Sequence, residues 1–311
     1  MAFRKVLQEI IAYSISLILP KVALNKRFFL LWEKKGFHII PIHFYEPIPD
    51  TRTLKDELWE SESDLAGLDM NTNEQLKLLH HVFHKFKEEI NFPKKRTQIP
   101  HEYYLDNGFF PSVDAEVLHG MIRHFKPKKI IEIGSGFSTY LSANACLLNI
   151  KKNEVKTELN VIDPFPNDIL KKGFPGLSSL TQKPLEKTPL EFFLQLEEND
   201  ILFIDSSHVV RIGGDVNYAF LEVLPRLKKG VIVHFHDIFL PLEYPKRFAL
   251  EVNRFWSEQY LLQAFLSFNY AYEILWASHY MHHKYPKECK SVFPSYREDV
   301  GPASFWIRRK E

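Results

Sequence analysis

Through the middle of the chain, short and almost continuously apolar segments alternate with longer segments of helical periodicity. The apolar segments are "IIEI" at 130–133, "LNVID" at 159–163, "ILFID" at 201–205 and "VIVHFHD" at 231–237. Strands that are apolar throughout, rather than at every second position, are typical of a parallel sheet covered by helices on both faces. The pattern therefore predicts an α/β fold built on a Rossmann-like, doubly wound and mostly parallel sheet.

Helical patterns connect these strands and continue beyond them. We expect helices at about 112–126, from about 138, at 188–200, at 215–230 and, as one long helix, at 246–269. One short additional strand is expected between the second and third apolar segments. The apolar segments at 272–277 and 303–309 predict a final pair of strands.

The first hundred residues follow a different pattern. Three prolines between residues 41 and 49 favour an extended path, and a helical stripe follows at 72–90. We therefore expect a helical and extended N-terminal region, 1–100, that packs on a core domain spanning 101–311. Residues 1–20 predict an amphipathic helix that packs on this core, with peripheral contact to a membrane surface as the alternative.

Composition narrows the class of protein. The chain has 311 residues, of which 45% are hydrophobic and 25% charged, as expected for a globular protein. Its formal net charge of +1 provides no overall field to attract nucleic acid, so no nucleic-acid partner is expected. Two cysteines form neither a disulfide framework nor a zinc pattern, which favours a reducing, cytoplasmic location.

Acidic residues and histidines gather where the predicted strands end. Parallel sheets of this kind bind ligands outside the carboxyl ends of their strands. The residues at these ends are Glu132, Gly134, Ser135 and Gly136, then Asp163, then Asp205 and His208, and finally His234, His236 and Asp237. A ligand site is therefore predicted at this edge.

Two of these strand ends indicate a nucleoside-containing cofactor. Gly134 and Gly136 allow the backbone to approach a ligand closely, and the next helix offers free N–H groups. Asp163 lies where a carboxylate can accept hydrogen bonds from both ribose hydroxyls. Thr139 occupies the position of the third glycine of the dinucleotide fingerprint, which disfavours a dinucleotide.

These segments resemble class I S-adenosylmethionine-dependent methyltransferases, in the branch that O-methylates small molecules or sugars. "IIEIGSGFST" resembles their first motif, "VIDPF" their acidic motif, and "ILFIDSSH" and "GVIVHFHDIF" their fourth and fifth strands. The resemblance covers residues 102–306 and implies an antiparallel terminal strand pair. It also implies that Gly134 and Gly136 face the methionine part of S-adenosylmethionine, that Asp163 binds its ribose, and that Asp205 lies near the cofactor amine or the acceptor. Glu132 and Ser135 are further candidates for cofactor binding.

Methylation of a hydroxyl group requires the loss of its proton, and histidine is suited to accept it. We expect His208, His236 and Asp205 to be catalytic, whereas His234 is equally compatible with the core. Related enzymes often use a divalent ion instead, so Asp205 and Asp237 are candidate ligands of Mg²⁺. The sequence offers no obvious third oxygen ligand, which favours the histidine base.

Two other functions remain open at this stage. One is an NAD-dependent oxidoreductase on a similar sheet, and the other is a non-catalytic binding or assembly module. The sequence does not identify the small-molecule or glycan acceptor, and it leaves the oligomeric state open.

Overall fold

The computed structural model describes residues 2–23 and 25–311, which divide into two compact units. The first unit extends to Leu58, and the second spans Trp59–Glu311. Residues 59–100 thus belong to the second unit, where residues 78–83 pack against helices α6 (Asp114–Phe125) and α13 (Pro286–Val292). The boundary expected from sequence near residue 100 lies inside this unit.

The first unit contains a helix where the sequence predicted one, and the side chains of residues 4–18 on it are all exposed. Its elements are α1 (Ala2–Ala23), α2 (Lys26–Lys34) and η1 (Thr51–Thr53), and α3 (Glu57–Glu60) crosses the unit boundary. Asn25 caps α2 by accepting a hydrogen bond from the backbone N–H of Arg27 at 3.0 Å. Within the described residues, no helix has the length and apolar character needed to cross a membrane.

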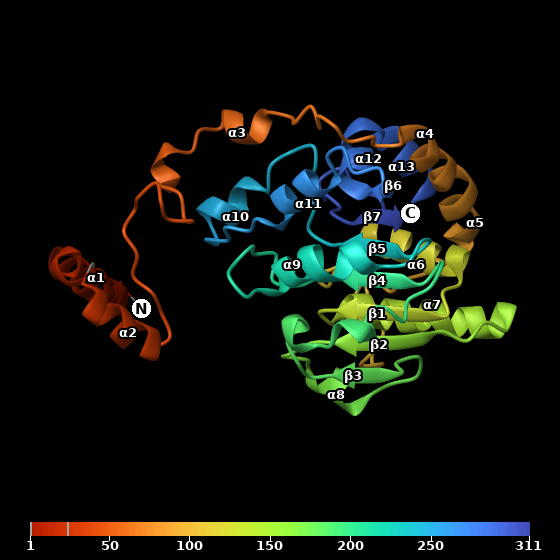
Figure 1. Ribbon diagram of the computed structural model, residues 1–311, viewed down its shortest axis with the longest axis horizontal. Helices are drawn as coiled ribbons and strands as arrows, with labels where there is room; N and C mark the ends of the chain where they lie inside the picture. The colour runs from red at the N-terminus through yellow and green to blue at the C-terminus, as the bar shows by residue number, and fades with distance from the viewer. Residues whose placement is uncertain (1, 24) are drawn as a thin grey trace. The chain divides into compact units, whose positions relative to one another are not determined.

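A seven-stranded sheet organises the second unit (Figure 1). Its strands are β1 (Lys129–Ile133), β2 (Glu158–Ile162), β3 (Ser179–Thr181), β4 (Ile201–Ile204), β5 (Ile232–Phe235), β6 (Tyr272–Ala277) and β7 (Phe305–Arg309). Their spatial order is β3-β2-β1-β4-β5-β7-β6. The first five are parallel, and β7 runs antiparallel to both β5 and β6. The predicted Rossmann-like sheet with an antiparallel terminal pair is confirmed.

Helices cover both faces of this sheet, which explains the continuous apolar character of its strands. Successive residues of a strand point to opposite faces. In β4, Ile201 and Phe203 face one core together with α6 (Asp114–Phe125) and α7 (Phe137–Asn153). Leu202 and Ile204 face a second core. That core includes side chains from α9 (Asp215–Tyr218), η6 (Ala219–Val223) and α11 (Glu258–Leu266).

The remaining helical elements are short. They are α4 (Thr72–Lys77), η2 (Leu78–Phe83), α5 (His84–Phe86), η3 (Lys87–Glu89), α8 (Asp168–Lys172), η4 (Leu185–Lys187), η5 (Leu190–Phe192), η7 (Leu224–Arg226), α10 (Lys246–Leu250), α12 (Ser278–Lys284) and α13 (Pro286–Val292). The stripe predicted at 72–90 corresponds to α4, η2, α5 and η3, which follow one another without a break.

Two helix predictions were wrong. Residues 188–200 form only the 3₁₀ turn η5 and following turns, in which backbone hydrogen bonds span three residues, as from the N–H of Phe193 to the oxygen of Leu190. Residues 246–269 form two helices, α10 and α11, separated by an irregular segment at 251–257. Asn253 in this segment adopts φ +54°, a left-handed conformation that ends a right-handed helix and that asparagine tolerates.

Candidate active site

The turn after β1 brings two strand ends into direct contact. Gly134 has φ +80°, and a Cβ atom at this position would lie 1.9 Å from the backbone oxygen of Asp205. Only glycine fits such a conformation and such an approach. A Cβ at Gly136 would meet no atom within 4 Å, so the space above this residue is open.

Glu132 lies beneath this turn and supports it. Its Oε1 accepts hydrogen bonds from the hydroxyl groups of Ser138 (2.6 Å) and Thr139 (3.0 Å) at the start of α7. The side chain is fully buried, and burial raises the pKa of Glu132 to about 8. Glu132 lines neither of the two cavities beside the turn, so the geometry gives it a supporting position.

A cavity of about 530 Å³ opens between the ends of β1, β2 and β4. Gly134, Ser135, Asp163 and Asp205 line it, as expected from the sequence. Asp163 follows β2 directly and accepts hydrogen bonds from the Ser135 hydroxyl and from the backbone N–H of Phe165. A smaller cavity of about 270 Å³ continues over Gly136 and also contacts Asp205.

The residues around these two cavities fit S-adenosylmethionine. A carboxylate at the end of β2 is available to the ribose, and the open backbone at Gly136 leaves room for the amino-acid part. Both cavities lie where the strand order reverses, between β1 and β4, which is the usual ligand position in such sheets.

A third and larger cavity of about 860 Å³ adjoins the cofactor cavities. It shares Asp205, Ser206 and Ser207 with the 530 Å³ cavity. His208, His236 and Asp237 also line it, so the expected catalytic and metal-binding residues converge there. A molecule in this cavity would therefore lie beside the cofactor.

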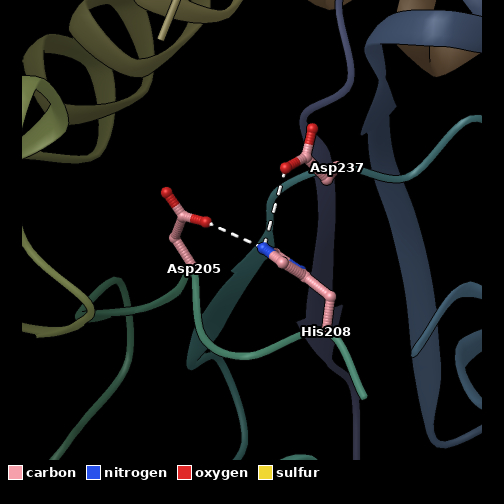
Figure 2. A group of neighbouring side chains, drawn as sticks. All are labelled: Asp205, His208 and Asp237. Atoms are coloured by element: carbon pink, nitrogen blue, oxygen red, sulfur yellow. Dashed lines mark ion pairs between the residues drawn. The ribbon is translucent and has the colours of Figure 1, made fainter. Parts of the chain in front are cut away.

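Three side chains in the large cavity form a compact cluster (Figure 2). Nε2 of His208 lies 3.2 Å from Oδ1 of Asp205 and 3.6 Å from Oδ2 of Asp237. One ligand atom from each residue falls within 4.8 Å of the others, close enough for one cation to bind all three. His208 thus offers a nitrogen atom beside the two carboxylates, whereas the sequence analysis considered only a third oxygen ligand.

Glu258 fixes the orientation of the His208 ring. Its Oε2 lies 2.8 Å from Nδ1 of His208, so the opposite nitrogen, Nε2, is directed at the two aspartates. The backbone oxygen of His208 in turn accepts hydrogen bonds from Ser257 and Glu258 at the start of α11. His208 and Asp237 adopt φ +60° and +55°, strained values that often occur at functional sites.

His236 and His234 occupy different environments despite their common strand. Nδ1 of His236 lies 3.7 Å from Oδ1 of Asp205, and Nε2 lies 3.6 Å from Oδ2 of the buried Asp114. His234 instead stacks on Phe203 and contacts Ser304 at 2.9 Å inside the core. Burial lowers the pKa of His234 well below its usual value, so this ring is neutral and structural.

Carboxylates control the charge of the two cavity histidines. Burial alone would lower the pKa of His208, but Asp205 and Glu258 outweigh it and raise the pKa to about 10. The pKa of His236 is also raised, because Asp237 and Asp205 outweigh burial. Burial opposes ionisation of Asp205, yet both histidines hold its pKa below the usual value. The carboxylates thus favour the charged form of both rings.

Several residues of the large cavity were not predicted from sequence. Among them are Asp114, Arg247, Arg254 and Trp256, and Glu258, which supports His208 without lining the cavity, was not predicted either. In the sequence, Asp114 has the position of a carboxylate that stabilises the first turn of α6 through its interaction with the helix dipole. The other four lie in or beside the supposed single helix at 246–269, whose interruption the sequence pattern did not indicate.

Comparison with known proteins agrees with this geometry. The Methyltransferase domain family matches residues 131–238, from β1 to just after β5. An uncharacterized protein of Archaeoglobus fulgidus is 33% identical over 169 residues, which are 52% of this chain and 75% of that protein. The chain shares a family with this archaeal protein.

Solved structures with a similar fold are more distant. The apo structure of CalS11, a TDP-rhamnose 3'-O-methyltransferase of calicheamicin biosynthesis, is 14% identical. The match covers 77% of this chain and 95% of the CalS11 chain, with a TM-score of 0.39. An apo structure of CmcI is 13% identical to this chain. That match covers 64% of this chain and 71% of the CmcI chain, with a TM-score of 0.35.

The strand order and the matched domain define the class of this protein. The chain belongs to the class I S-adenosylmethionine-dependent methyltransferases, and the matched residues include all those that line the 530 Å³ cavity. It is thus an enzyme whose cofactor is S-adenosylmethionine. The oxidoreductase and the non-catalytic module considered from sequence are not favoured.

Proposed function

We propose that the enzyme methylates a hydroxyl group of a small-molecule or sugar acceptor bound in the 860 Å³ cavity. The observation that carries this proposal is the shared wall, Asp205–Ser207, between the cofactor cavity and the cavity that holds His208. When bound, S-adenosylmethionine supplies a methyl group on a positively charged sulfur. Alignment of the acceptor oxygen with that methyl group is then the main task of the protein.

The acceptor hydroxyl must lose its proton, and the residues around Asp205 are in position to assist. In one arrangement, the neutral form of His208 or His236 accepts this proton while Asp205 orients the ring, as expected from the sequence. Because the carboxylates raise the pKa of both rings, this arrangement requires a pH high enough to deprotonate the histidine. Glu258 then acts through His208, much as a buried carboxylate orients the histidine of a catalytic triad.

In the other arrangement, Asp205, His208 and Asp237 would hold a divalent cation, which would lower the pKa of a bound hydroxyl. The direction of Nε2 toward both aspartates favours this arrangement, and Glu258 resembles the carboxylates that support metal-binding histidines. Mg²⁺ fits the two carboxylates, and the imidazole also suits Mn²⁺ or Zn²⁺. We therefore propose the cation site as the better-supported alternative.

The experiment is methyl transfer from labelled S-adenosylmethionine to a panel of glycans and hydroxylated small molecules. It is run with and without EDTA, in the parent enzyme and in His208→Ala and His236→Ala. Activity lost with EDTA and restored by Mg²⁺ or Mn²⁺ supports the cation site. Activity that resists EDTA but falls about 10²–10⁴-fold in a histidine variant supports the base. No transfer to any acceptor, despite cofactor binding, contradicts the proposed O-methylation.

We also propose a cytoplasmic location, supported by two cysteines, Cys146 and Cys289, that are both free and buried. Peripheral membrane contact through residues 1–20 remains the alternative to packing on the core. Exposed apolar side chains along α1, including Leu7, Ile10 and Leu17, support a contact of one kind or the other.

A further inference from the structure

Two arginines lie at the large cavity, close to one another. Arg247 comes from α10 and Arg254 from the irregular segment at 251–257. Both guanidinium groups contact the same ring, with Cζ atoms 5.5 Å and 5.4 Å from the centre of Phe248. The chain turns tightly here, because the backbone N–H of Arg254 donates to the backbone oxygen of Phe248 at 2.7 Å.

Neither arginine has a carboxylate ion-pair partner among the residues that the structure describes. Asp299, which also lines the cavity, is paired with Arg297 at 2.6 Å. Both Arg247 and Arg254 are exposed, so their donor groups are free to bind a ligand. Two adjacent guanidinium groups are well suited to phosphate or carboxylate oxygens.

Trp256 connects these arginines to the Asp205, His208 and Asp237 cluster. The Trp256 ring lies 5.0 Å from Cζ of Arg254, and its centre is 4.4 Å from that of the His208 ring. The cavity thus presents positive charge, an aromatic surface and the proposed catalytic cluster in succession. Its volume of about 860 Å³ falls within the usual range of roughly 300–1,000 Å³ for ligand sites.

We propose that the acceptor carries an anionic group, a phosphate or a carboxylate, which Arg247 and Arg254 bind while its hydroxyl faces Asp205 and His208. This inference rests on the proposed O-methylation and specifies its substrate class. Phe248 and Trp256 would contact the part of the acceptor between the anionic group and the hydroxyl. The arginines therefore select the acceptor and position it for methyl transfer.

The test measures binding of inorganic pyrophosphate and of malonate by calorimetry. The proteins are the parent, Arg254→Gln, and Arg247→Gln combined with Arg254→Gln. Arg226→Gln is the matched control, because Arg226 is an exposed arginine outside the cavity. We expect the parent to bind at least one anion, at least tenfold weaker binding in the double variant, and no change in the control. Tighter binding of pyrophosphate indicates a phosphate group, and tighter binding of malonate a carboxylate.

Binding of S-adenosylhomocysteine is measured on the same proteins and should be unchanged in the arginine variants. If the parent binds neither anion, or if both arginine variants bind as tightly as the parent, the anionic acceptor is excluded while the methyltransferase function stands. Failure of the parent to bind S-adenosylhomocysteine would instead contradict the cofactor site itself. If the double variant does not fold, Arg254→Gln alone should still weaken binding.

Discussion

Gly134 and Gly136 lie two positions apart in the sequence and serve different purposes. At Gly134 the backbone itself fills the space, because the oxygen of Asp205 lies where a Cβ would be. At Gly136 the space is open and belongs to the cofactor cavity. We therefore propose that the first glycine is needed for folding and the second for cofactor binding.

This difference predicts that alanine at Gly134 affects stability, whereas alanine at Gly136 affects cofactor binding. Gly134→Ala should lower the melting temperature, since φ +80° and the contact with Asp205 each disfavour a side chain, at a cost of about 1–3 kcal/mol. Gly136→Ala should keep the melting temperature but weaken binding of S-adenosylhomocysteine about tenfold or more. Thermal unfolding and calorimetry on both variants check this. A Gly136→Ala protein with parental affinity would show that the cofactor does not pass over this residue.

Asp163 provides a second test of the cofactor position. Asp163→Ala removes a carboxylate from the nucleoside cavity and should cost about 2–3 kcal/mol of binding to S-adenosylhomocysteine. Asp168→Ala is the control, because Asp168 is an exposed aspartate in the nearby α8. Equal affinities of the Asp163 variant and the parent would place the ribose elsewhere.

A substitution of Glu258 tests the cation site while all three proposed ligands stay in place. Glu258→Gln keeps the shape of the side chain but weakens its hold on Nδ1 of His208. We expect about 10–100-fold lower affinity for Mn²⁺, measured by calorimetry in the absence of substrate. Glu251→Gln, on the exposed segment before α11, should have no effect. Unchanged affinity in the Glu258 variant would show that His208 does not bind the ion.

At the scale of elements, sequence periodicity predicted the strands better than the helices. Glycines mark the end of one buried strand and the approach to another, after Ile133 and before Val231. The break inside 246–269 has no such signal, because Arg247 to Trp256 contain neither glycine nor proline. It depends on tertiary contacts, including those of Ser257 and Glu258 with His208. This is why Glu258 and the cavity arginines could not be found from sequence.

Helix α1 carries exposed apolar side chains, and we expect them to pack against another surface. We expect a protein lacking residues 2–20 to melt at a lower temperature, if these side chains pack on the core. Circular dichroism measures the melting, and sedimentation with anionic liposomes tests the alternative. Equal melting temperatures, with sedimentation only of the full-length protein, would establish the membrane contact. An Arg4→Gln, Lys5→Gln variant then reports whether charge contributes.

At the scale of the whole molecule, one carboxylate joins three helical elements of the second unit. Glu89, in η3, contacts Arg123 of α6 at 2.7 Å and Lys152 of α7 at 2.7 Å. Burial opposes its ionisation, but Arg123, Lys152 and His119 lower the pKa of Glu89 to about 2. This carboxylate is therefore ionised and paired throughout the physiological range.

A lowered pKa stabilises the folded state only while the carboxylate is ionised. The contribution of Glu89 is complete above pH 4.5 and is lost as the pH falls toward 2. Glu89→Gln should reduce the free energy of unfolding at pH 7 by on the order of 2 kcal/mol. This difference from the parent should narrow at pH 3.5. Urea unfolding at both pH values, with the exposed Glu88→Gln as control, checks the prediction. A difference that is constant with pH would mean that the carboxylate charge is not responsible.

The irregular segment at 251–257 has a consequence for how this enzyme diversifies. The glycine turn and Asp205 constrain each other through backbone contact, so their sequence has little freedom to vary. Residues 251–254 are exposed and belong to neither core of the sheet, so substitutions there cost little stability. Mutation can thus alter acceptor preference at Arg254 while the methyl-donor site stays intact. Libraries made to change the substrate of this enzyme should therefore start with this segment.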